Sequence, residues 1–125
     1  MEAVAGQAQG PQTHRTAIEE RRRKYQEHRR TELERLCGVL REIGARQVIL
    51  FGSAARGEAG LDSDLDLLVV LETDLNFVER LAFLYRMLLP QVDVDILAYT
   101  PEEMADLRES NPLVRRALAE GEVLL

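Results

Sequence analysis

Two short apolar runs in the middle of the chain flank a glycine-broken turn and a pair of aspartates. The runs, Val48 to Phe51 and Leu67 to Leu71, have the composition of buried strands. Asp64 and Asp66 stand just before the second run. Because side chains alternate along a strand, residues at i and i+2 share a face, about 6 to 7 Å apart. Two carboxylates this close repel unless a cation binds between them, so the pair predicts a Mg²⁺ site.

The residues that follow the first run are suited to binding an anion. Gly52 and Ser53 come where the chain leaves a strand for a helix, and the first N–H groups of a helix have no partner within it. The glycine lets the backbone approach a ligand closely. Arg56, about one turn later, adds a planar set of donors. We therefore expect a phosphate site at Gly52 and Ser53, to which Arg56 contributes.

The order of these features resembles a known signature. Gly52-Ser53, ten intervening residues and Asp64-Leu65-Asp66 are similar to the motif of the DNA polymerase β-like nucleotidyltransferase superfamily. Within it, the chain resembles the minimal nucleotidyltransferase (MNT) group, which commonly has Gly-Ser-X-Ala-Arg-Gly followed by Ser-Asp-X-Asp-Leu. Residues 52–57 and 63–67 match both patterns. The resemblance extends from about residue 48 to residue 101 and implies an α/β (α+β) fold, a small mixed β-sheet packed by helices, here with an N-terminal helical extension.

A third carboxylate would complete a site for two Mg²⁺ ions. Asp93 and Asp95 alternate with apolar residues in a predicted strand, so both are placed on one face. In the family, the third aspartate stands a few residues before a Thr-Pro-Glu sequence, which matches Thr100 to Glu102. The resemblance thus favours Asp95, and Asp93 remains the alternative. It also implies that Asp64, Asp66 and Asp95 bind the metals and that Gly52 and Ser53 hold the β and γ phosphates.

The function implied by the resemblance is Mg²⁺-dependent nucleotidyl transfer. The donor would be ATP or another nucleoside triphosphate, and the acceptor a hydroxyl group. Small members of the group are frequently antitoxins of HEPN/MNT pairs that add AMP to a tyrosine of a helical HEPN-type ribonuclease. The alternative is a non-catalytic binding module that neutralises its partner by contact alone.

The charge distribution bears on possible partners. The 125 residues carry a net charge of −6, with about +3 through Arg46 and about −9 beyond it, which argues against nucleic acid as the partner of the catalytic half. The basic run from Arg21 to Lys24 is read as a solvated helix face paired with nearby glutamates, or alternatively as a surface for a protein or RNA. No apolar segment reaches membrane-spanning length, and a cytoplasmic protein is expected.

The remaining patterns predict one domain built around this sheet. Residues 1–12 are expected to be disordered, 13–125 to form a single domain, 13–30 to be a projecting charged helix and 31–125 the compact core. Cys37, among leucines, is expected to be a buried thiol. The predicted helices are 13 or 16 to about 43, 77–89, 101–109 and 112–120, and further strands are 92–97 and 122–125.

Overall fold

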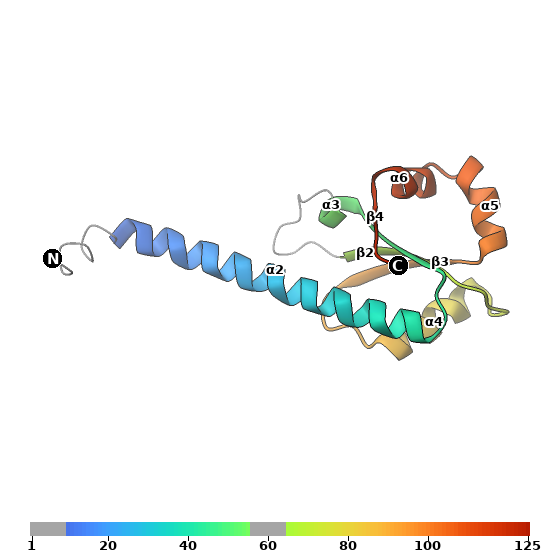
Figure 1. Cartoon of the computed structure of the whole chain (residues 1–125), viewed down its shortest axis with the longest axis horizontal. Helices are drawn as coiled ribbons and strands as arrows, with labels where there is room; N and C mark the ends of the chain where they lie inside the picture. The colour runs from blue at the N-terminus through green and yellow to red at the C-terminus, as the bar shows by residue number, and fades with distance from the viewer. Residues whose placement is uncertain (1–9, 56–64) are drawn as a thin grey trace. The chain divides into compact units, whose positions relative to one another are not determined.

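The computed structural model describes residues 10–55 and 65–125, with the side chains described from residue 16 onward. Its centre is a four-stranded mixed sheet in the order β3-β2-β1-β4, with helices on both faces (Figure 1). The predicted mixed sheet packed by helices is therefore confirmed. The elements are α2 (Gly10–Glu42), β1 (Gln47–Phe51), α3 (Gly52–Ala55), β2 (Leu65–Val70), α4 (Phe77–Leu88), β3 (Val94–Tyr99), α5 (Pro101–Ser110), α6 (Pro112–Glu120) and β4 (Glu122–Val123).

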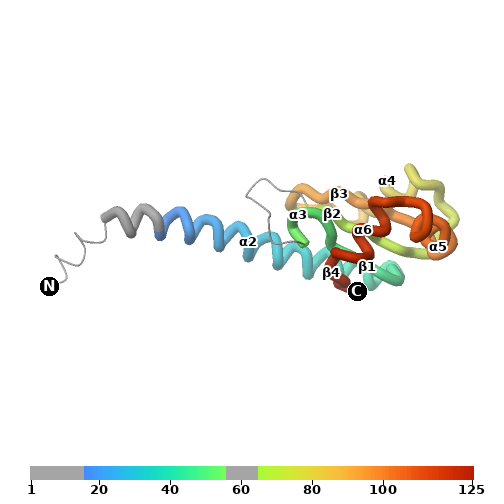
Figure 2. The backbone as a smooth tube through the Cα atoms, turned by 90° about the horizontal axis from the view of Figure 1, so that it is seen from above, coloured from blue at the N-terminus to red at the C-terminus, as the bar shows by residue number. Residues whose placement is uncertain are grey.

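The sheet separates two apolar clusters because alternate strand residues face opposite sides. One cluster joins the C-terminal parts of α2 and α4 to the sheet, with Leu36, Leu40, Leu84 and Leu88 fully buried. The other lies under α5 and α6 and contains Ile49, Leu68, Val70, Met104, Val114 and Ala117. Figure 2 shows α5 and α6 over the sheet from above. Cys37 belongs to the first cluster, and burial raises the pKa of its thiol, as expected for a structural cysteine.

β1 is an interior strand of the sheet, between β2 and β4. It pairs antiparallel with β2 on one side and with β4 on the other, whereas β2 and β3 run parallel. The parallel pair needs a crossover, and α4 supplies it. β2 begins two residues earlier than predicted, so Asp66 lies within the strand and not before it.

The helix ends follow capping rules that the sequence shows. Asn76 caps α4 in a capping box with Glu79. Thr100 and Glu103 form a capping box at α5, with Pro101 in the first turn. Asn111 caps α6, and its side chain accepts hydrogen bonds from two N–H groups of that helix.

The buried face of α4 includes a charged side chain. Val78 is 74% exposed, while Arg80 is buried at 5% exposure. Arg80 tolerates burial because its guanidinium donates to the carbonyls of Leu75 and Ala98 and to the carboxylate of Glu103. A sequence pattern that scores only apolar residues cannot anticipate a buried arginine satisfied in this way.

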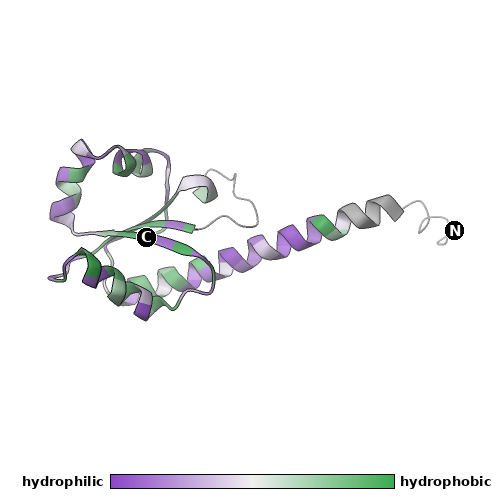
Figure 3. Cartoon of the chain, turned by 180° about the vertical axis from the view of Figure 1, so that it is seen from behind, coloured by the Kyte–Doolittle hydropathy of each residue, from purple (hydrophilic) through white to green (hydrophobic). Residues whose placement is uncertain are grey.

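The chain divides into two compact units, an N-terminal unit that ends at Thr31 and a second unit that runs from Glu32 to Leu125. In the N-terminal unit, α2 begins at Gly10, before the predicted starts at Thr13 or Thr16, and residues 1–9 of the expected disordered tail lie outside the described residues. Pro11 falls in the first turn of this helix, a position that proline tolerates. Arg23 pairs with glutamates at both i−3 and i+4, which agrees with the solvated-face interpretation of this strongly hydrophilic stretch (Figure 3).

Two polar contacts secure the C-terminal end of α4 within the second unit. Glu32 accepts hydrogen bonds from the Arg35 guanidinium at 2.8 Å and from the backbone N–H of Gln91 at 2.6 Å. Arg35 also donates to the Leu88 carbonyl at 2.9 Å. In the part of the chain that the structure describes, no helix is both long and apolar enough to cross a membrane.

Candidate active site

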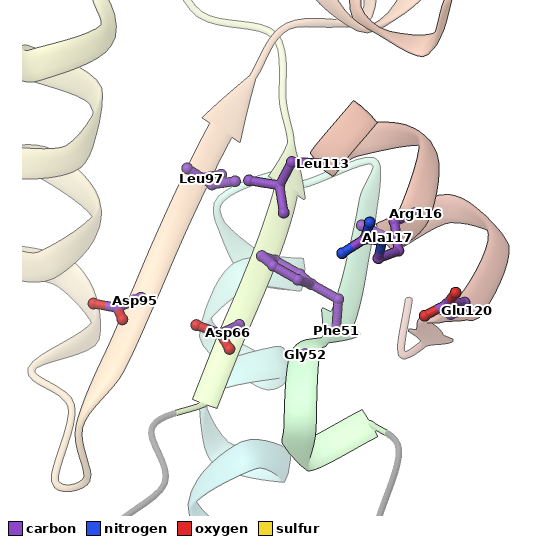
Figure 4. A pocket seen from close by; sticks show the side chains of 9 residues that line it. All are labelled: Phe51, Gly52, Asp66, Asp95, Leu97, Leu113, Arg116, Ala117 and Glu120. Atoms are coloured by element: carbon purple, nitrogen blue, oxygen red, sulfur yellow. The ribbon is translucent and has the colours of Figure 1, made fainter. Parts of the chain in front are cut away.

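A pocket of about 390 Å³ opens between the sheet and α6 (Figure 4). Its floor comes from the ends of β1, β2 and β3, and its wall comes from α6. The described residues that line it are Phe51, Gly52, Asp66, Asp95, Leu97, Leu113, Arg116, Ala117 and Glu120. The pocket therefore contains three of the predicted site residues, Gly52, Asp66 and Asp95.

Asp66 and Asp95 are brought together by the parallel pairing of β2 with β3. They are direct partners in the register, so their Cα atoms lie about 4.8 Å apart across the ladder. Both side chains face the pocket, as Figure 4 shows. Asp66 is half-buried and Asp95 is exposed. Two residues that lie 29 positions apart in the sequence thus form one acidic pair at the sheet edge of the pocket.

Gly52 brings the chain into direct contact with this pair. It has a φ of +76°, a conformation that side chains with a Cβ rarely adopt. A Cβ at this position would lie 2.4 Å from Oδ2 of Asp66. The neighbouring residue, Phe51, pairs with Asp66 in the β1–β2 register. The backbone leaving β1 therefore passes against the Asp66 carboxylate, and only glycine leaves room for it.

The edge strand that carries Asp95 is held by side chains of α4. Successive carbonyls along a strand point to opposite sides. The carbonyls of Asp93 and Tyr99 accept hydrogen bonds from the N–H groups of Leu65 and Leu71, so the carbonyls of Val94 and Ala98 point away from β2. Val94 accepts from the Tyr85 hydroxyl at 2.7 Å, and Ala98 accepts from Arg80 at 2.9 Å. These bonds lie on either side of Asp95 and fix its strand.

Arg80 also connects the edge strand to α5. Its guanidinium donates to Glu103 at 2.7 Å and 3.2 Å, and Glu103 in turn accepts from the backbone N–H of Thr100. The hydrogen bond from Arg80 is the main reason that the pKa of Glu103 lies below 4.5. The edge strand is thus tied to a helix on each face of the sheet.

The remaining predicted site residues are placed differently. Ser53 lies in α3 beside Gly52 and is half-buried, but it is not among the described residues lining the pocket. Asp64 and Arg56 lie outside the described residues. Asp93 directly precedes β3, which starts at Val94 and not at the predicted Val92. The pocket includes Asp95 and not Asp93.

Sequence reasoning missed the contribution of α6. Leu113, Arg116 and Glu120 recur at i, i+3 and i+7, so they share one helix face, and that face lines the pocket. The spacing was visible, but nothing local indicates which neighbour a helix face will meet. The helix was predicted only to close the domain.

The acidic pair has the chemistry of a magnesium site. Carboxylate oxygens are the protein ligands that Mg²⁺ prefers, usually one or two of them, with water and phosphate oxygens completing the shell. No group of three or more His, Cys, Asp or Glu side chains gathers within residues 10–55 and 65–125, and Asp64 lies outside them. Asp66 and Asp95 fit the ion as two oxygen donors on one face.

Comparison with known proteins agrees with this geometry. The sequence profile of the nucleotidyltransferase domain matches residues 33–87, which include Gly52 and Asp66. A solved structure assigned as a minimal nucleotidyltransferase is 32% identical, with a TM-score of 0.53, and the match covers 77% of this chain and 92% of that one. A crystal structure of a toxin-antitoxin with AMP-PNP has a similar fold, with 22% identity, a TM-score of 0.51, and 74% of this chain and 71% of that one covered.

Curated protein sequences contain no significant match to the chain. The profile match nevertheless includes the glycine and the aspartate that meet at the pocket, and the 32% identical structure spans most of both chains. On this sequence identity, coverage and fold, the chain belongs to the nucleotidyltransferase domain family.

Proposed function

We propose that the protein is a Mg²⁺-dependent nucleotidyltransferase that transfers AMP from ATP to a hydroxyl group of a partner protein, as the antitoxin of a HEPN/MNT pair. The observation that carries the proposal is the pairing of Asp66 with Asp95 beside Gly52 at one pocket. Acidic residues alone would be uninformative. Their contact with a positive-φ glycine at the end of β1 joins a carboxylate site to the backbone turn expected to receive phosphates.

Each residue has a role in this proposal. Asp64, Asp66 and Asp95 hold the metal ions, and Gly52 and Ser53 hold the β and γ phosphates, assisted by Arg56. Bound Mg²⁺ supplies positive charge that offsets the charge developing on the phosphoryl oxygens. In this proposal Asp95, the more exposed of the described pair, receives the acceptor hydroxyl and accepts its proton. The hydroxyl oxygen bonds to the α-phosphorus, and the bond from that phosphorus to the bridging oxygen breaks to release pyrophosphate.

The choice of donor and acceptor rests on likeness. The toxin-antitoxin structure that shares the fold was crystallised with AMP-PNP, an ATP analogue, so ATP is the first donor to test. The described pocket has one wall and an open acidic edge, which leaves room for an acceptor carried by another protein. A HEPN-type helical partner follows from the resemblance to MNT antitoxins.

The test is transfer of label from α-labelled ATP to the product of the adjacent gene, with Mg²⁺ and the full chain. We expect Asp66→Asn and Asp95→Asn each to lower the initial rate by at least about 100-fold, because each removes a charged ligand from the reacting centre. Asp93→Asn is the matched control, since Asp93 is exposed, two residues away and not part of the described pocket. Its rate is expected to stay within about twofold.

Two results would contradict the proposal. One is label transfer that survives in both Asp66→Asn and Asp95→Asn. The other is the absence of transfer to the partner while neutralisation of the partner persists in both variants. That second result would assign the protein as a binding module that acts by contact.

A further inference from the structure

The pocket has an apolar half that the proposed metal and phosphate roles leave unused. Leu97 and Phe51 form part of its floor, and Leu113 stands on its wall. Leu113 is 48% exposed although it lies on the helix that covers this face of the sheet. Since exposed apolar area is unfavourable in water, an apolar surface inside a pocket favours a ligand with an apolar ring.

Arg116 is the one cation among the described residues that line the pocket. It follows Leu113 by three residues, so the two side chains share a helix face. Within the described part of the chain, its guanidinium makes no hydrogen bond or ion pair, whereas Arg80 and Arg35 are both engaged. An arginine that lines a pocket without a carboxylate partner is available to an anion, and its planar donors suit phosphate oxygens.

The position of α6 indicates which substrate this wall serves. α6 packs over β1, through the cluster of Ile49, Val114 and Ala117, and β1 leads directly into Gly52. Asp95 lies on β3, at the other edge of the sheet. The wall therefore lies on the side of the pocket where the phosphates are proposed to bind, and opposite the strand proposed to meet the acceptor (Figure 4).

We infer that α6 is the nucleoside-binding wall of the pocket: Leu113, with Phe51, contacts the base and ribose of the nucleoside triphosphate, and Arg116 contacts its phosphates. This inference rests on the proposed function, because it takes the triphosphate to be held at Gly52. A volume of about 390 Å³ lies within the range of small-molecule sites. An apolar surface, one cation and an acidic metal-binding edge together match a nucleotide bound with Mg²⁺. A neutral hydroxyl acceptor carries no negative charge for Arg116 to bind.

The experiment compares two ligands by titration calorimetry of the full chain with Mg²⁺: ATP and inorganic tripolyphosphate, which has the phosphates and lacks the nucleoside. Arg116→Gln is expected to weaken both ligands by about five- to tenfold, because it removes a charge-assisted contact to phosphate. Leu113→Gln is expected to weaken ATP by about fivefold and to leave tripolyphosphate within about twofold, because it removes apolar contact only.

Each variant has a matched control on the same protein. Arg115→Gln removes the same charge one position earlier, from an exposed side chain outside the described pocket. Met87→Gln makes a comparable change at a side chain that is 45% exposed on α4. Both controls are expected to bind ATP and tripolyphosphate as the unaltered protein does. Equal urea midpoints for all four variants would exclude a loss of folding.

The outcomes separate this inference from the proposed function. If Asp66→Asn abolishes ATP binding while Arg116→Gln and Leu113→Gln match their controls, the nucleoside wall is wrong and the transferase proposal stands. If the α6 variants change the KM for the protein acceptor but not the affinity for ATP, the wall serves the acceptor, and the inference is again overturned. If the unaltered protein binds neither ligand, both the inference and the proposed function fail.

Discussion

Replacing Gly52 with alanine tests the geometry of the site most directly. The new Cβ would lie 2.4 Å from Oδ2 of Asp66, so the carboxylate must move by about 1 Å to reach ordinary van der Waals contact. It can move, because it is the end of a flexible side chain and not backbone. The stability cost therefore comes mainly from placing alanine at a φ of +76°, about 1–2 kcal/mol.

The cost in activity is expected to be much larger than the cost in stability. A displacement of about 1 Å at a reacting group lowers rates by about 100-fold. The Gly52→Ala protein should therefore lose about 1–2 kcal/mol in urea unfolding and still be folded, while its rate of nucleotidyl transfer from ATP falls by about 100-fold.

Gly44→Ala is the control that separates these two effects. Gly44 also has a positive φ, +92°, but a Cβ there would meet no atom within 4 Å. We expect a similar loss in the free energy of unfolding and no loss of transfer. The reasoning is refuted if Gly52→Ala retains transfer within about threefold of the unaltered protein, or if Gly44→Ala loses as much activity as Gly52→Ala.

Three further predictions concern stability. Arg80→Met should lower the free energy of unfolding by about 2–3 kcal/mol in urea at pH 7, because it leaves a buried carbonyl without its donor and Glu103 without its partner; an unchanged midpoint would contradict this. Folding lowers the pKa of Glu103, so the ionised carboxylate stabilises the folded protein above pH 4.5 and this stabilisation is lost as the pH falls through the folded-state pKa. The free energies of unfolding of the unaltered protein and of Glu103→Gln, measured in urea, should therefore converge in acid. Gly121→Ala should lower the free energy of unfolding, measured by thermal unfolding, by about 3 kcal/mol, because its Cβ would lie 2.4 Å from a backbone carbonyl oxygen. Gly38→Ala is the control: Gly38 is in a helix with open space for a Cβ, so alanine there should be neutral or stabilising by about 0.5–1 kcal/mol.

Features that depend on neighbouring residues in the sequence could be predicted. The capping box of Thr100 and Glu103 uses residues three positions apart, and the strand patterns before Gly52 and after Asp66 are continuous runs. The choice of Asp95 came from its spacing to Thr100, and the β2–β3 register now places it opposite Asp66. The capping box and the strand patterns are local, and Asp66 and Asp95 lie on strands that are joined by the single crossover helix α4.

Features that depend on packing could not be predicted in the same way. Arg80 tolerates burial because Ala98 and Glu103, from segments further along the chain, accept hydrogen bonds from it, and no pattern around it shows them. Arg116 lines the pocket because α6 crosses the sheet at a particular place.

The α4 side chains along the edge of β3 limit how another protein can approach Asp95. The carbonyls of Val94 and Ala98 that point away from β2 already accept hydrogen bonds from Tyr85 and Arg80, so they are not available to pair with an incoming extended segment. Strand addition is a common mode of protein recognition, and it is disfavoured here. We therefore expect a partner of the proposed transferase to reach Asp95 without pairing along this edge of β3.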